Sequence, residues 1–195
     1  VRSEEVMVPK WVRGEESAKM VKPWSKNLAM LGLGGSIGTK SNGITAKVIA
    51  VSNFEELANR SNEVKGKIVL FNVPFDTYSN TVKYRVRGAI EASKHGAVAS
   101  LVRSVGTFSM NTPHTGNSSY EDGVKKIPHA AITIEDAAMI GRMLENGQDV
   151  EVNLKMEAQN YPDVLSHNVV GEIIGSELPD QVIVIGVHID SLDVV

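Results

Sequence analysis

The sequence predicts an α/β fold, and three consecutive stretches carry that prediction. Residues 66–73 (GKIVLFNV) form a short apolar run bounded by Gly66 and Pro74, as is typical of a buried strand. Apolar positions then recur at helical spacing over 80–94, and a second buried run, AVASLV, follows at 97–102. A strand, a helix and a strand in this order predict a βαβ crossover with two parallel strands.

A second helix and two further strands are expected after a long polar segment. Residues 104–128 are rich in Thr, Ser, Asn, Gly and Pro, which predicts an irregular loop. A strand follows at 130–134, and Thr133 opens a pattern like a capping box that predicts a helix ending at Gly147. Apolar and polar residues alternate over 150–157, which predicts a half-exposed strand.

The N-terminal region contains short β-tolerant runs separated by glycine. The runs at 6–13 and 17–23 flank Gly14 and a Glu15-Glu16 pair, and they predict a hairpin. We interpret the glutamate pair as a solvated turn rather than as catalytic carboxylates. The glycines of LGLGGSIGT are out of register with G-x-G-x-x-G and precede the strand-like ITAKVIAV, so they predict turns and no dinucleotide loop.

Composition narrows the classes of function. The chain has 195 residues, 42% hydrophobic and 22% charged, with a formal net charge of −3, so a nucleic-acid partner is not expected. Cysteine is absent, and any bound metal must use His, Asp or Glu. The apolar runs are far shorter than the ~18 residues of a membrane helix, so we expect no membrane partner.

A second domain is expected from Pro162, and candidate chemistry begins at the end of its apolar run. Residues 182–187 (VIVIGV) predict a strand buried on both faces. His188 and Asp190 follow its carboxyl end, where open α/β sheets place their sites. In an extended chain, residues two apart point to the same side. Two interpretations remain at this point, a metal site and a strand end whose polar residues enter solvent.

Several segments resemble, in the same order, the co-catalytic zinc exopeptidase family. They are KWVRGEESAKMV, LGLGGSIGT, GITAKVIAV, GKIVLFN, YRVRGAIEASKHGAVASLVRS, TPHTG, KIPHAAITIEDAAMIGRM and VIVIGVHIDSLDV. The resemblance implies a protease-associated-type β/α domain at 30–160, inserted in an incomplete zinc-peptidase α/β sheet domain. Residues 1–29 would be the N-terminal segment of that peptidase domain, and 163–195 would be its truncated start.

The same resemblance implies roles for particular residues. In the family's His-x-Asp-Ser motif the histidine binds one of two zinc ions and the aspartate lies behind it; these positions are His188 and catalytic Asp190 here. The family has glycine before the histidine, whereas this sequence has Val187. The other zinc ligands and the general base would lie beyond Val195, so this chain alone is expected to be inactive.

The resemblance further implies a zinc-dependent carboxypeptidase or dipeptidase that hydrolyses dipeptides or short peptides, acts as a homodimer, and is secreted or lysosomal. The alternative is a non-catalytic protease-associated binding or lid module. Two sequons, at Asn59 and Asn117, would be glycosylated on the secretory route.

Overall fold

A computed structural model describes residues 1–189 of the chain, and its contacts divide the chain into two compact units. The larger unit runs from Trp11 to Tyr161. The smaller unit combines Val1–Lys10 with the chain from Pro162 onward. The larger unit therefore begins well before residue 30, where the sequence placed a domain boundary.

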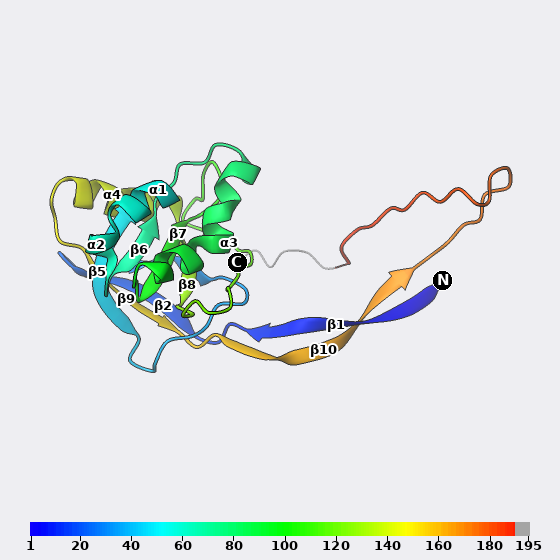
Figure 1. Cartoon of the computed structure of the whole chain (residues 1–195), viewed down its shortest axis with the longest axis horizontal. Helices are drawn as coiled ribbons and strands as arrows, with labels where there is room; N and C mark the ends of the chain where they lie inside the picture. Colours follow the sequence, from blue (N-terminus) through cyan, green and yellow to red (C-terminus); the bar gives the residue numbers. More distant parts are fainter. Residues whose placement is uncertain (190–195) are drawn as a thin grey trace. The chain divides into compact units, whose positions relative to one another are not determined.

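The larger unit is built on one mixed sheet of eight strands, in the order β3-β2-β9-β5-β6-β7-β8-β4 (Figure 1). The strands are β2 (Glu16–Lys22), β3 (Lys26–Leu28), β4 (Met30–Gly32), β5 (Ile44–Val51), β6 (Ile68–Phe71), β7 (Ala99–Arg103), β8 (His129–Ile132) and β9 (Glu151–Met156). The four helices are α1 (Phe54–Asn59), α2 (Ser61–Val64), α3 (Tyr78–Lys94) and α4 (Ile134–Glu145). This architecture confirms the predicted α/β fold.

The predicted βαβ crossover is confirmed in the middle of the sheet. β6, α3 and β7 follow one another, and β6 pairs parallel with β7 from Ile68↔Ala99 to Phe71↔Val102. β5 and β8 extend the parallel set on either side, and β9 joins β5 in the antiparallel sense. The structure describes the whole polar segment between β7 and β8, and it contains no helix or strand there. This confirms the predicted irregular loop.

Helices cover both faces of this sheet because its central strands are apolar on both sides. Along β6, Ile68 and Leu70 belong to one core cluster, whereas Val69 and Phe71 belong to the other. α4 contributes buried side chains to the first cluster, and α1, α2 and α3 contribute theirs to the second. The first cluster also contains Met20, which explains why the segment before residue 30 belongs to the larger unit.

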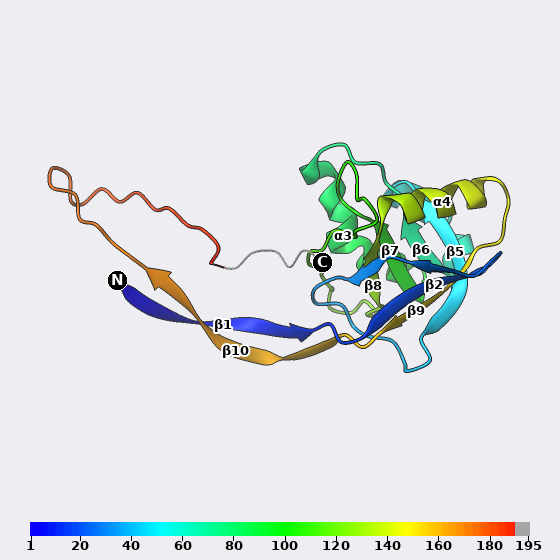
Figure 2. The same cartoon turned by 180° about the vertical axis from the view of Figure 1, so that it is seen from behind.

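The predicted N-terminal hairpin is wrong. β2 pairs with β9 and β3, whereas β1 (Arg2–Val12) forms a separate two-stranded sheet with β10 (Gln159–Val170). Figure 2 shows β2 and β9 running side by side. The prediction of a solvated glutamate turn is also wrong for Glu16, because both of its carboxylate oxygens accept a hydrogen bond from Gly32 N at 3.0 Å. Burial raises the pKa of Glu16, although the Gly32 amide and Arg13 oppose that effect.

The start of α4 confirms the predicted cap. Thr133 Oγ1 accepts a hydrogen bond from Asp136 N at 3.2 Å. The buried Asp136 carboxylate in turn accepts from Ala29 N at 3.1 Å and from Lys26 Nζ at 2.6 Å. The helix start is therefore tied to the segment that connects β3 and β4.

Replacing Thr133 by alanine is expected to lower the free energy of unfolding by about 1 kcal/mol, because the helix loses its side-chain cap. The matched change Thr133→Ser keeps the hydroxyl and should recover most of that loss. Urea unfolding of the two variants measures the difference. Equal stabilities of the alanine and serine variants would show that the cap does not stabilise α4.

The smaller unit contains most of the β1–β10 ribbon and the chain that follows it. Gln181 N donates to Leu178 O at 3.0 Å, which closes a turn around Pro179. The strand predicted at 182–187 is wrong, since these residues lie in no strand and Val184 is 86% exposed. A strand needs a neighbour for its backbone groups, and no described strand pairs with this segment. Within residues 1–189, no helix has both the length and the apolar character of a membrane span.

Candidate functional site

The predicted metal ligand His188 lies near the end of the described chain. Its side chain is exposed, in a segment without regular structure where Val187 and Ile189 are 85% and 84% exposed. Asp190, the predicted catalytic residue, lies outside the described residues, as does Ser191. The structure therefore does not test the predicted pairing of His188 with Asp190.

The described residues do not complete a zinc site. An imidazole is a normal zinc ligand, and catalytic zinc sites take about three protein ligands and leave one position for water. Among residues 1–189, no group of three or more His, Asp or Glu side chains is placed to hold a metal ion. The described part of the chain thus supplies His188 as one candidate ligand, and no catalytic step through zinc can be derived from it.

His129, the first residue of β8, is fully buried. Its Nδ1 lies 3.2 Å from Ser100 O and its Nε2 lies 2.9 Å from Arg85 O. Burial lowers the pKa of His129 to about 4, although the carbonyls favour the protonated ring. Both nitrogens face backbone carbonyls, so His129 has a structural role.

The two sequons lie at the surface of the larger unit. Asn59 is the last residue of α1 and is exposed, and the serine of its sequon, Ser61, begins α2. Asn117 is exposed in the polar loop, where it forms an isolated parallel bridge with Gly34. Both asparagines are thus accessible to a modifying enzyme in the folded chain.

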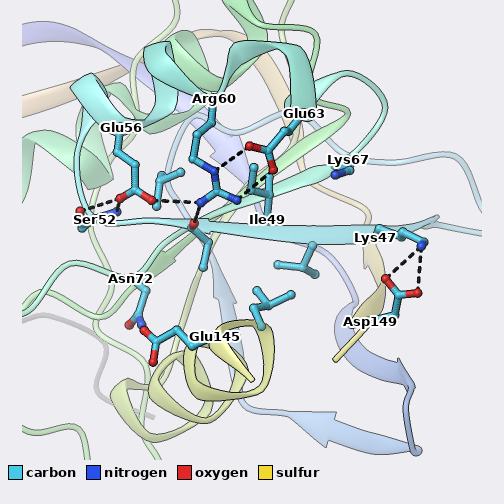
Figure 3. A pocket seen from close by; sticks show the side chains of 15 residues that line it. Lys47, Ile49, Ser52, Glu56, Arg60, Glu63, Lys67, Asn72, Glu145 and Asp149 are labelled. Carbon is cyan, nitrogen blue, oxygen red and sulfur yellow. Dashed lines mark hydrogen bonds and ion pairs between the residues drawn. The ribbon is translucent and has the colours of Figure 1, made fainter. Parts of the chain in front are cut away.

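A groove of about 390 Å³ lies beside β5, and no motif in the sequence marked it. One wall comes from α1, α2 and the residues after them, including Glu56, Arg60, Glu63 and Lys67 (Figure 3). The opposite wall comes from the end of α4 and the turn after it. The floor is β5 from Lys47 to Val51, together with Ser52 that follows it. We call this hollow the β5 groove.

The groove exists because β9 departs from β5 halfway along that strand. β9 pairs with β5 only from Ile44↔Leu154 to Lys47↔Glu151, and one more bond, from Val48 N to Val150 O at 2.8 Å, follows. Beyond Val48, β5 pairs only with β6. Half of the strand therefore has an open edge although it lies in the middle of the sheet.

Arg60 dominates one wall of the groove. Its Nε and Nη2 donate to the two oxygens of Glu63 at 3.0 and 3.1 Å, and its Nη1 donates to Glu56 and to Ala50 O, both at 3.0 Å. Hydrogen bonding to Glu63, together with Glu56, raises the pKa of Arg60 although burial opposes it. For Glu56, burial raises the pKa, but hydrogen bonds from Ser52 and Arg60 outweigh it and lower the pKa overall. The side chains of this wall thus form a mutually paired network.

Comparisons with solved structures show which class of protein shares this fold. No family model matches the chain. A peptidase M28 precursor from Shewanella amazonensis SB2B superimposes with a TM-score of 0.85 at 34% identity, over 90% of this chain and 41% of that one. A zinc aminopeptidase from Bacillus subtilis shares the fold with a TM-score of 0.55 at 20% identity, over 85% of this chain and 35% of its own. The chain has the fold of a region of M28 peptidases.

Sequence similarity points to one particular peptidase. Carboxypeptidase Q of Xenopus laevis is 56% identical over 191 residues, which are 98% of this chain and 41% of the relative. The chain is therefore homologous, along almost its whole length, to carboxypeptidase Q, and the resemblance to a peptidase that the sequence analysis found is confirmed. It spans about 41% of the length of the curated relatives that it matches.

Proposed function

We propose that the protein carrying this sequence is a zinc-dependent exopeptidase that hydrolyses dipeptides or short peptides. The observation that carries the proposal is the 56% identity to carboxypeptidase Q along 98% of this chain. The fold shared with a peptidase M28 precursor supports the same class.

In this proposal His188 binds one of two zinc ions, and Asp190 lies behind it and orients its imidazole. The other ligands come from parts of the protein outside the described residues. Bound zinc would hold and acidify the water that attacks the peptide bond. The contribution of this chain's own described residues is the exposed imidazole of His188.

The test is peptide hydrolysis together with metal analysis. A protein of the relatives' length that carries this sequence should release amino acids from dipeptides, contain zinc by mass spectrometry, lose activity with a chelator and regain it with zinc. The 195-residue chain alone should hold no stoichiometric zinc and show no turnover. Turnover by that chain, or a metal-free and inactive longer protein, would contradict the proposal.

We also propose that the protein is secreted or lysosomal, glycosylated at Asn59 and Asn117, and homodimeric. The exposure of both sequon asparagines supports glycosylation. The location and the homodimer rest on the family resemblance. Protein from a secretory expression host should lose the mass of two glycans on treatment with an N-glycosidase. Asn59→Gln and Asn117→Gln should each reduce that loss to the mass of one glycan. No change in mass would contradict glycosylation, and a monomer by analytical ultracentrifugation of the longer protein would contradict the dimer.

A further inference from the structure

The open edge of β5 exposes backbone groups that no part of the described chain pairs. Asn72 N donates to Val51 O at 3.0 Å, so Val51 directs its backbone groups toward β6. Successive residues of a strand alternate in this respect, and Val48 and Ala50 therefore direct theirs into the β5 groove. Ala50 O accepts from Arg60 and Val48 N donates to Val150 O. Ala50 N and Val48 O remain without a partner among the described residues.

The backbone groups that Ala50 directs into the groove are those with which an extended peptide pairs. Val150 already lies opposite Val48, so an antiparallel strand laid along the open part of β5 pairs with Ala50. Its carbonyl accepts from Ala50 N, and its amide donates to the second lone pair of Ala50 O, beside Arg60. The open stretch from Val48 to Ser52 spans ~13 Å at the usual strand rise, which is the length of about four residues. The volume of about 390 Å³ suits a small ligand.

The charges at the two ends of the groove indicate in which direction a bound peptide would run. Lys67 lies toward the end where Lys47 pairs with Asp149, and Glu145 lies toward the opposite end, beside Asn72 (Figure 3). Neither Lys67 nor Glu145 forms an ion pair with another described residue, although Lys67 helps lower the pKa of Glu63 and of Asp149 after stronger hydrogen bonds from Arg60 and Lys47. A peptide with free ends would place its carboxylate at Lys67 and its ammonium at Glu145.

We propose that the β5 groove binds a short peptide with free termini as an added strand, antiparallel to β5 and in line with β9. Its N–H and C=O groups bond to Ala50 O and Ala50 N, and its terminal charges lie against Lys67 and Glu145. The site lies entirely in the larger unit and involves neither His188 nor zinc. The proposal is therefore independent of the proposed peptidase activity.

The test uses the 195-residue chain and tetra-alanine with free termini as the probe. In ¹H–¹⁵N spectra, titration should shift the Ala50 amide proton downfield, because its hydrogen becomes bonded. An analogue methylated on all three peptide nitrogens keeps both charges but cannot donate to Ala50 O, and we expect it to bind about 5- to 10-fold more weakly. Acetylated and amidated tetra-alanine loses the terminal charges and should also bind more weakly.

Charge variants test the direction of the peptide. Lys67→Gln and Glu145→Gln should each weaken binding of the free peptide by about two- to fivefold, as expected for exposed ion pairs. Lys67→Gln should not affect the amidated peptide, which lacks the carboxylate. Lys19→Gln, which removes an exposed lysine of β2, is the matched control and should change nothing. An unshifted Ala50 amide at saturating peptide, or equal affinities for the free and N-methylated peptides, would overturn the proposal.

Discussion

Alanine in place of Phe71 is expected to destabilise the larger unit by about 3–5 kcal/mol. Phe71 is 0% exposed, and its ring lies 5.4 Å from that of Phe54 and 5.8 Å from that of Tyr84. Removing it leaves a cavity between β6 and the helices on that face of the sheet. Tryptophan fluorescence during urea unfolding measures the loss, because both tryptophans, Trp11 and Trp24, belong to the larger unit.

Phe108→Ala is the matched control for this prediction. Phe108 lies in the polar loop and is 65% exposed, so its replacement should change stability by less than about 0.5 kcal/mol. A loss below about 1 kcal/mol for Phe71→Ala, or equal losses for the two variants, would contradict the assignment of Phe71 to the core.

Acid should destabilise the larger unit through His129. Burial lowers the pKa of the folded His129 to about 4, below the ordinary value of 6.5, so protonation favours the unfolded chain. The stability that the neutral ring contributes is fully present above pH 6.5 and is lost as the pH falls from 6.5 to about 4. The loss across that window is about 3 kcal/mol.

His129→Gln should remove this dependence, because glutamine does not titrate. The variant is expected to be less stable than the parent at pH 7, since a packed ring is lost, but its stability should vary less between pH 6.5 and 4. His167→Gln, at an exposed position of β10, is the control and should keep the parent's profile. Parallel profiles for the parent and His129→Gln, from urea unfolding at several pH values, would contradict the prediction.

The sequence predicted those parts of the fold whose signals are local. The apolar run of β6, the periodicity of α3 and the run of β7 together define a crossover within one continuous stretch. The hydroxyl of Thr133 lies three residues from the amide that it caps, so the start of α4 was also readable. Homology to carboxypeptidase Q was recognisable because the matching segments occur in the same order along the whole chain.

The parts that the sequence did not predict depend on distant partners. β2 looked like half of a local hairpin, but it pairs with β9, where Ala18 lies opposite Leu154. His129 directly follows the polar segment 104–128, and no local pattern shows that β7 and α3 enclose its ring. The β5 groove arises where β9 leaves β5 beyond Lys47, and strand patterns do not show where a pairing stops. The strand predicted at 182–187 lacks a neighbour among the described residues.

His188→Gln in a protein of the relatives' length that carries this sequence tests the central claim most directly. Zinc per chain, by mass spectrometry, and dipeptide hydrolysis should both fall sharply, since the change removes an imidazole ligand. The urea unfolding of the larger unit should stay as in the parent, because His188 lies outside that unit. Zinc content and turnover equal to those of the parent would show that His188 is not a ligand of the peptidase site.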